Sequence, residues 1–385
     1  MDREELAGWL RLTLTPGVGN TTARKLLAAF GLPSGIFCQS FTALAQVVSE
    51  VQATALGRLP PELPALVEST MNWLQLQTAD GSDLSQRSIV TLGDGLYPSA
   101  LLEMADPPLV LYLQGDPAGL NVSARRIAIV GSRNPTAQGT TNARHFALAL
   151  GQAGVTIVSG LAIGIDGAAH EGALEVPPSE TRRVATIAVV GTGLDRVYPK
   201  RHLDLARQIA RTGLLISEYP IGTPPLALNF PKRNRLIAAL SSGTLVVEAA
   251  LQSGSLITAR LAAEMGRDVF AIPGSIHSTQ SRGCHALIQQ GAKLVESAQD
   301  VLEEMAWGGA EVAVGTLARH DGLPVMEDGD NALLQALGYD PVGLDALQAR
   351  TGIDTPRLQA QLMALELQGQ VARLPGGLFQ RIAHA

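Results

Sequence analysis

The chain has 385 residues, of which 46% are hydrophobic and 17% are charged, and this length suggests two or three domains. The composition is typical of globular proteins and excludes disorder over most of the length. The formal net charge of −6 argues against a basic surface over the whole protein, which many nucleic-acid-binding proteins have.

Signals for export, membranes and metals are absent from the sequence pattern. The chain begins Met1-Asp2-Arg3-Glu4-Glu5, which is acidic where a secretory signal is basic and then apolar. An uncharged run at residues 147–165 is broken by glycines and predicts a soluble helix, turn and strand. The two cysteines of the chain, Cys38 and Cys284, do not belong to a CxxC motif. We therefore expect a cytoplasmic protein without membrane contact, disulfide, bound metal or cofactor.

Residues 1–83 predict a small helical domain. The turn Pro16-Gly17-Val18-Gly19 separates two helical patterns, as in a helix-hairpin-helix or a sterile-alpha-motif-like domain. In a helix-hairpin-helix, such glycines let backbone N–H groups approach a DNA phosphate. A plain junction in a helical bundle is an equally good interpretation, because this segment has five basic and eight acidic residues.

Residues 84–306 alternate between strand and helix patterns. Six short apolar runs have the length of buried strands. They lie at residues 127–130, 155–158, 186–190, 214–216, 244–247 and 269–272. Helical patterns such as 140–152 lie between them. This alternation predicts an α/β fold of βαβ units, with a Rossmann-like parallel sheet.

Two further segments follow the sheet domain. Residues 307–330 contain one basic and five acidic residues without periodicity and predict an acidic linker, as residues 78–83 predict a shorter one. Residues 331–385 contain three helical patterns, the third opened by Thr355-Pro356, and then a hairpin pattern. This order predicts a winged-helix domain.

Ligands of a parallel α/β sheet bind beyond the carboxyl ends of the strands. Small and polar residues there leave backbone N–H groups free for a phosphate, and no complete GxGxxG dinucleotide motif is present. The candidates at these ends are Gly131-Ser132-Arg133, Ser159-Gly160 and Ser253-Gly254. Two windows around the candidate loops, residues 117–165 and 219–247, contain no acidic residue, as a site for an anionic polymer requires.

A basic segment lies in the second window. It reads Phe230-Pro231-Lys232-Arg233-Asn234-Arg235. Three cations beside an aromatic ring suit the phosphate backbone and a stacked base of a single-stranded nucleic acid. The simplest alternative is a solvated basic start of a helix, and the acid-free windows favour the nucleic acid.

Three other residues could carry chemistry. Asp166 and His170 are one helical turn apart and could act as acid and base, but a structural hydrogen bond is the favoured interpretation. Glu248 follows a predicted strand and could hold either a ribose hydroxyl group or an arginine such as Arg233 or Arg235. We weigh these two roles equally.

Together, these loops resemble the DNA-processing protein A family (DprA, also called Smf). The matching segments occur in family order from about residue 90 to residue 300. They include Gly131-Ser132-Arg133, Ser159-Gly160-Leu161-Ala162, Ser217-Glu218-Tyr219-Pro220, the basic segment 230–235, Val247-Glu248-Ala249 and Ser253-Gly254-Ser255. The resemblance implies a non-enzymatic homodimer that binds and protects single-stranded DNA and helps to load the RecA recombinase during natural transformation and recombination.

The resemblance also implies roles for individual residues. DNA contacts are expected at Gly131, Ser132, Arg133, Ser159, Gly160, Phe230, Lys232, Arg233, Asn234 and Arg235. Support of the pocket is expected from Asp166, His170, Glu248, Ser253 and Gly254. The dimer surface is expected at His285, Leu287 and Ile288, with the recombinase contact nearby.

Two other functions are compatible with the sequence. Rossmann-like phosphoribohydrolases of nucleoside monophosphates use a Gly-Thr turn and a glutamate. Gly243-Thr244 with Glu248 resembles that pattern, at a longer spacing and without a preceding Pro-Gly-Gly. Alternatively, the winged helix reads duplex DNA. Its four basic and four acidic residues argue against this, so we expect at most weak binding of duplex DNA.

Overall fold

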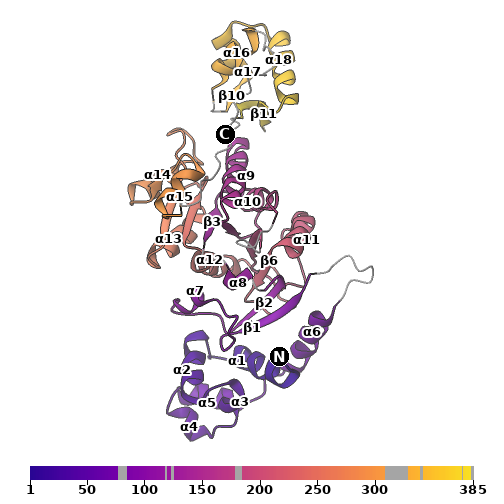
Figure 1. Cartoon of the computed structure of the whole chain (residues 1–385), viewed down its shortest axis with the longest axis vertical. Helices are drawn as coiled ribbons and strands as arrows, with labels where there is room; N and C mark the ends of the chain where they lie inside the picture. Colours follow the sequence, from indigo (N-terminus) through magenta and orange to yellow (C-terminus); the bar gives the residue numbers. More distant parts are fainter. Residues whose placement is uncertain are drawn as a thin grey trace.

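The computed structural model describes residues 1–76, 85–117, 119–122, 125–177, 184–307, 328–338, 341–374 and 376–382. Three parts follow one another along the long axis of the molecule (Figure 1). Helices of the N-terminal part lie at one end, a large sheet with its helices lies in the middle, and a small C-terminal domain lies at the other end. The predicted linker 78–83 lies outside the described residues.

In the described residues, the central sheet has nine strands in the order β1-β2-β6-β5-β4-β3-β7-β8-β9. Their bounds are β1 (Arg87–Thr91), β2 (Val110–Gly115), β3 (Arg126–Val130), β4 (Thr156–Ser159), β5 (Thr186–Val189), β6 (Leu214–Ser217), β7 (Gly243–Val246), β8 (Asp268–Ala271) and β9 (Lys293–Leu294). Strands β3 to β9 pair in parallel, which confirms the predicted α/β sheet.

The edge formed by β1 and β2 is antiparallel and was not predicted. The connection between these two strands holds only the short helix α7 (Ser99–Leu102), whereas a parallel connection usually contains a longer crossover helix. The sequence therefore showed no βαβ pattern at this edge.

Helices cover both faces of the sheet. They are α8 (Gly119–Val122), α9 (Ala137–Gln152), α10 (Ile165–Leu174), α11 (Leu203–Thr212), α12 (Asn229–Leu240), α13 (Ser255–Glu264), α14 (Arg282–Gln289) and α15 (Ala298–Glu304), with a short 3-10 helix, η1 (Lys200–His202). In β3, Ile127 and Ile129 join the core under α9 and α10, whereas Ala128 and Val130 join the core under α12 and α13. A strand buried on both faces requires a continuous apolar run.

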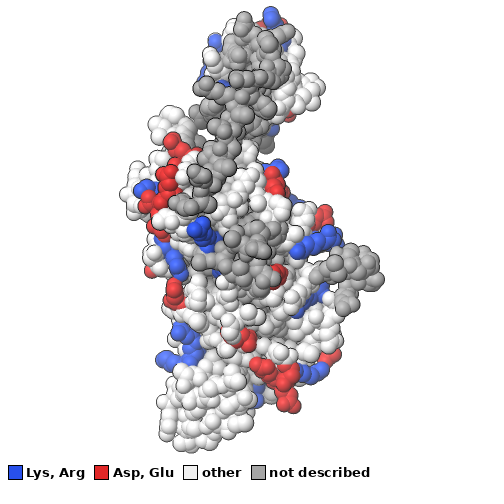
Figure 2. All heavy atoms as spheres, viewed as in Figure 1, with Lys and Arg blue, Asp and Glu red and all other residues white. Residues whose placement is uncertain are grey.

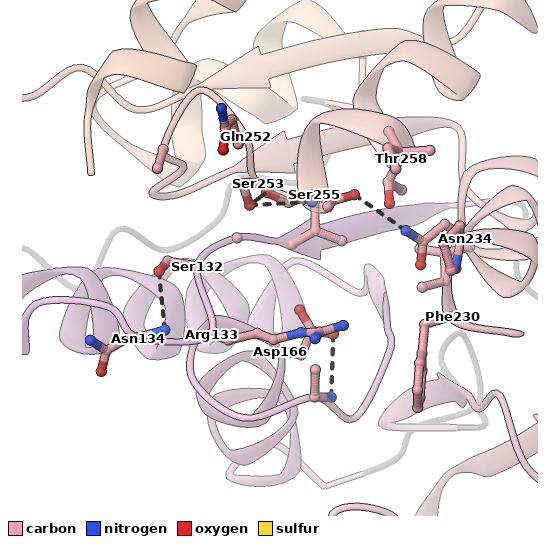
Figure 3. Close-up of a pocket in the computed structure, with 18 of the residues that line it drawn as sticks. Ser132, Arg133, Asn134, Asp166, Phe230, Asn234, Gln252, Ser253, Ser255 and Thr258 are labelled. Carbon is pink, nitrogen blue, oxygen red and sulfur yellow. Dashed lines mark hydrogen bonds between the residues drawn. The ribbon is translucent and has the colours of Figure 1, made fainter. Parts of the chain in front are cut away.

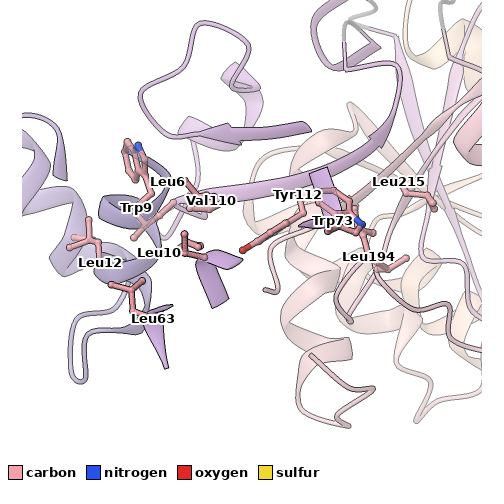
Figure 4. Close-up of a cluster of buried hydrophobic side chains, with 14 of the residues drawn as sticks. Leu6, Trp9, Leu10, Leu12, Leu63, Trp73, Val110, Tyr112, Leu194 and Leu215 are labelled. Atoms are coloured by element: carbon pink, nitrogen blue, oxygen red, sulfur yellow. The ribbon is translucent and has the colours of Figure 1, made fainter. Parts of the chain in front are cut away.

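Within residues 1–76, six helices form the N-terminal part. They are α1 (Arg3–Leu14), α2 (Asn20–Phe30), α3 (Pro33–Phe37), α4 (Phe41–Ala45), α5 (Glu50–Leu56) and α6 (Leu63–Gln75). Their core, which includes Leu6, Trp9 and Trp73, is continuous with Val110 and Tyr112 of β2 (Figure 4). The N-terminal helices are therefore packed against the sheet.

The C-terminal domain contains α16 (Asp328–Leu337), β10 (Val342–Gly343), α17 (Leu344–Thr351), α18 (Thr355–Leu367), β11 (Val371–Leu374) and β12 (Leu378–Arg381). This is the predicted winged helix, with an additional short strand, β10, that pairs with β12. Helix α16 begins within the predicted linker 307–330, and residues 308–327 of that linker lie outside the described residues. Within the described ranges, no helix is both long and apolar enough to span a membrane.

Candidate nucleic-acid interface

A cavity of about 420 Å³ lies at the carboxyl ends of β3 and β7 (Figure 3). Strand β3 lies between β4 and β7 in the sheet, so the strand order changes direction along the chain at β3. Such a change of direction is where open α/β sheets bind ligands. The walls come from the loop after β3, the first turns of α10 and α12, the loop after β7 and the start of α13.

The loop after β3 is fixed tightly to its surroundings. A Cβ atom at Gly131 would lie 2.7 Å from Cγ1 of Ile165, so this position has no room for a side chain. The backbone N–H of Ser132 donates a hydrogen bond of 2.7 Å to the carbonyl oxygen of Glu248. This packing leaves the exposed side chain of Arg133 extended across the cavity (Figure 3).

Arg133 and the Phe230 ring form one side of the cavity, and the Tyr198 ring lies beside Phe230. The guanidinium carbon of Arg133 lies 5.7 Å from the centroid of the Phe230 ring. The Phe230 ring in turn lies 5.5 Å from the Tyr198 ring, centroid to centroid. Tyr198 lines a smaller adjoining hollow of about 60 Å³, together with Gly160. Tyr198 was not predicted as a site residue, because an isolated Tyr-Pro pair carries no signal for stacking.

Arg233 is buried inside the cavity wall, with 4% of its surface exposed. Its Nε has no hydrogen-bond partner, and in the described part of the chain it forms no ion pair. A Cβ atom at Gly160 would lie 1.4 Å from Nη1 of Arg233, so glycine makes room for this guanidinium group. Burial lowers the pKa of Arg233, and the nearby Asp166 carboxylate opposes this shift. A buried cation with so few partners favours an anionic ligand.

The carboxylate of Asp166 holds the loop after β4. Its Oδ2 accepts hydrogen bonds from the backbone N–H groups of Gly160, at 3.2 Å, and Ala162, at 3.3 Å. Burial raises the pKa of Asp166, and the Arg233 charge opposes the shift. His170 has a different partner, because its Nδ1 lies 2.8 Å from Oγ1 of Thr186 in the core. Asp166 and His170 are therefore separate structural groups and not an acid–base pair.

The buried His170 predicts a loss of stability in acid. Burial, with smaller contributions from His202 and Arg233, lowers the pKa of His170 from 6.5 to about 3. The unfolded chain therefore binds a proton below pH 6.5 that the folded chain does not, and stability falls as the pH drops. We expect His170 to contribute a loss of about 2 kcal/mol between pH 7.5 and pH 5 in urea unfolding.

The matched variants are His170→Gln and His277→Gln, since His277 is exposed. We expect His170→Gln to flatten the dependence of stability on pH over this range. We expect His277→Gln to keep the pH dependence of the parent protein. An unchanged dependence in His170→Gln would show that other groups cause the loss.

Four predicted DNA contacts do not line the cavity, and one of them, Gly160, lines only the adjoining hollow. The hydroxyl group of Ser159 is fully buried and donates to the carbonyl oxygen of Ile129 at 2.6 Å. Lys232 is exposed on the outer surface of α12. Arg235 pairs with Glu218 and donates to the carbonyl oxygen of Asp106 at 2.8 Å. Arg233 and Arg235 are two positions apart on one helix, so they cannot face the same side.

The prediction that Glu248 holds a ribose hydroxyl group or an arginine is wrong. Its carboxylate accepts hydrogen bonds from the backbone N–H of Thr136, at 2.9 Å, and from the Thr136 hydroxyl group, at 2.6 Å. Thr136 also caps α9. Glu248 therefore holds neither Arg233 nor Arg235, and it is not among the residues that line the cavity. Its carboxylate supports the loop after β3 from beneath and is not placed to bind a ribose.

The wall opposite Arg133 is polar and uncharged. The Asn234 amide donates to the carbonyl oxygen of Gly254 at 3.3 Å, which joins α12 to the loop after β7. The hydroxyl oxygens of Ser253 and Ser255 lie 2.6 Å apart. Gln252 and Thr258 also line this side and were not predicted. Gln280, a further lining residue that was not predicted, donates its amide to the carbonyl oxygen of Asn134 in the loop after β3 at 3.1 Å. Single neutral polar residues on helices and loops give no distinctive sequence signal.

On the face that Figure 2 shows, basic and acidic side chains are scattered over the central part and do not merge into one basic surface. Arg133 forms no ion pair with any residue that the structure describes, and Lys232 forms none within the same ranges. The acid-free windows contain the two arginines of this cavity, Arg133 and Arg233.

The predicted dimer residues lie on α14, after strand β8. Leu287 and Ile288 are half-buried and pack against the sheet core. His285 holds the preceding loop, because its Nε2 lies 3.0 Å from the carbonyl oxygen of Gly274. The neighbouring edge strand β9 exposes Leu294, 47% of whose surface is accessible.

Two family profiles match the chain. The profile described as DNA recombination-mediator protein A matches residues 88–306, and that described as DprA winged helix domain matches residues 323–377. Protein Smf of Escherichia coli K12 is 40% identical over 81% of this chain and 80% of its own length. Protein Smf of Synechocystis is 33% identical over 99% of this chain and 100% of its own length.

Solved structures agree with these matches. DNA processing protein A of Streptococcus pneumoniae superimposes with a TM-score of 0.60 at 37% identity, covering 79% of this chain and 98% of that chain. DNA processing protein A of Helicobacter pylori, described as having a unique single-stranded DNA binding mode, gives a TM-score of 0.52 at 32% identity. It covers 58% of this chain and 97% of that chain.

Proposed function

Because the chain belongs to the DprA/Smf family of DNA-processing proteins, we propose that it binds single-stranded DNA in the cavity beyond β3 and β7. One observation carries the proposal. Two arginines without ion-pair partners in the described chain, the exposed Arg133 and the buried Arg233, line one cavity with the Phe230 ring. The single-stranded DNA binding named for the Helicobacter pylori relative supports it.

The cavity suits a strand whose bases are free. Arg133 would bind a backbone phosphate at the mouth, and Arg233 would bind one deeper in. The Phe230 ring offers a stacking surface that accepts any base, and the neutral polar wall opposite offers hydrogen bonds without a fixed pattern. Bases of a duplex are already stacked and paired. The site therefore favours single strands over duplexes.

The proposed role is binding and not catalysis. The groups that suggested an enzyme, His170 and Glu248, are held by Thr186 and Thr136 as parts of the scaffold. A protein that covers single strands in the cytoplasm would protect them and help to load RecA during natural transformation and recombination. Residues 84–306 would carry the main site, with residues 1–83 and 331–385 as accessory domains.

We further propose that the protein acts as a homodimer through α14. His285, Leu287 and Ile288 would form the contact, with the RecA surface nearby. Each protomer would bring one cavity to the same DNA strand. Since the second contact is then intramolecular, long strands would bind more tightly than short ones.

Fluorescence anisotropy of a labelled oligonucleotide and its duplex, over a salt series, tests the proposal. We expect tighter binding of the single strand, with a log–log salt slope of about −3 if four phosphates are neutralised. Equal affinity for the duplex would contradict binding in a site for free bases. A slope near zero would contradict the phosphate contacts.

A further inference from the structure

A second cavity, of about 300 Å³, lies at the amino end of β3, whereas the first cavity lies at its carboxyl end. Helix α12 joins the two cavities. Its first turns, with Phe230 and Asn234, line the first cavity, and its last residues, Ala239 and Leu240, line the second. A helix of 12 residues spans about 18 Å, so the second cavity is distinct from the DNA site.

Arg126 is a buried cation in this second cavity. It lies at the start of β3 with 5% of its surface exposed. Its Nη2 donates to the carbonyl oxygens of Gly119, at 3.1 Å, and of Leu120, whereas its buried Nε has no partner among the residues that the structure describes. Within the described chain, Arg126 forms no ion pair. Burial lowers the pKa of Arg126 to about 10, so the group is still charged at neutral pH.

A second arginine makes the cavity cationic. Nη2 of Arg267 lies 2.6 Å from Oε2 of Glu103, and Nε of Arg267 has no hydrogen-bond partner in the described ranges. The Glu103 side chain is 69% exposed, so water screens this ion pair. The charged lining residues are Arg126, Arg267 and Glu103, which leaves one positive charge in excess.

We propose that this cavity binds a phosphate group, with Arg126 as the inner ligand and Arg267 as the outer one. The two carbonyl oxygens satisfy only part of the Arg126 guanidinium group, and an anion that reaches a buried cation without a carboxylate beside it stabilises that cation further. Its planar set of N–H donors matches two oxygens of a phosphate. The volume lies at the small end of the range for ligand sites.

Two kinds of ligand could supply the phosphate group that this cavity would bind. It is either a free phosphate ion or a phosphate of a DNA strand that continues along α12 from the first cavity. The DNA source rests on the proposed function, whereas the binding of free phosphate does not. The two sources are therefore tested separately.

Calorimetric titration with inorganic phosphate tests the site in the full chain. The protein carries Arg133→Gln, which removes the exposed arginine of the first cavity, and the comparison of the Arg126 and Arg125 variants separates any phosphate that Arg233 still binds. We expect saturable binding that Arg126→Lys weakens at least tenfold, because lysine keeps the charge but loses the planar donors. The matched control is Arg125→Lys, at an exposed neighbouring position, with a change below about twofold.

Two results would overturn the proposal. One is the absence of phosphate binding in the Arg133→Gln protein. The other is equal affinity in Arg126→Lys and Arg125→Lys, which would make Arg126 a purely structural partner of the two carbonyl groups. If Arg126→Lys does not fold, Arg267→Gln replaces it, since Arg267 is partly exposed, and we expect at least fivefold weaker binding.

The salt dependence of oligonucleotide binding then identifies the source. If a DNA phosphate occupies the site, Arg126→Gln reduces the magnitude of the salt slope by about 0.7. If the slope is unchanged while inorganic phosphate still binds the parent protein, the ligand is a free phosphate. Failure of the parent protein to bind single strands would reject the proposed function and leave the calorimetric result standing.

Discussion

Arg133→Gln is expected to weaken the binding of a single-stranded oligonucleotide by about 30-fold, or about 2 kcal/mol. Arg133 is exposed at the mouth of the cavity and carries no ion pair in the described chain, so its charge is available to a phosphate. Because one phosphate contact is lost, the magnitude of the log–log salt slope should fall by about 0.7. Fluorescence anisotropy over a salt series measures both quantities.

The matched control is Arg58→Gln, in the loop after α5. Arg58 is also exposed, so this substitution removes the same charge from the N-terminal helices, outside the cavity lining. We expect its effect on affinity to stay below about twofold. If the two variants lose affinity equally, long-range net charge rather than the cavity governs binding.

Phe230→Ala is expected to weaken binding of the single strand to a similar extent, by about 30-fold, with the salt slope unchanged. The ring is the cavity's stacking surface, and stacking of a base on an aromatic side chain contributes about 1–3 kcal/mol. No charge is removed, so no counterion release is lost. Anisotropy with the same oligonucleotide measures the affinity and the slope.

Phe230→Tyr serves as the control, because it keeps the ring beside Tyr198 and Arg133. We expect it to bind within about threefold of the parent protein. A fall in the salt slope of Phe230→Ala would indicate that the ring acts by positioning Arg133. Equal losses in the alanine and tyrosine variants would argue against stacking.

The sequence predicted the sheet well because its strands are buried on both faces. In β3, successive side chains enter different cores, Ile127 on one side and Ala128 on the other. Every position must then be apolar, which makes the run visible without tertiary information. The antiparallel edge escaped prediction because β1 is only partly buried and its link to β2 contains no long helix.

The sequence also located the site, but it did not show which residues line the cavity. The basic segment 230–235 was identified as a unit, yet helix geometry turns Arg233 into the cavity and Arg235 toward Glu218. A stretch of charges in the sequence does not reveal which face of a helix each one occupies, because that depends on how the helix is rotated against the sheet.

By itself, the sequence determined the order of the elements and the parallel strands whose carboxyl ends carry small and basic residues. These depend on local patterns of apolar and polar side chains, which act over a few residues. Only the tertiary structure decided the partners of individual side chains. Glu248 meets Thr136, 112 positions earlier, and Arg126 is buried at the second cavity with Arg267. Such contacts depend on how distant elements pack, since burial removes water and leaves each polar group with the neighbours that the fold provides.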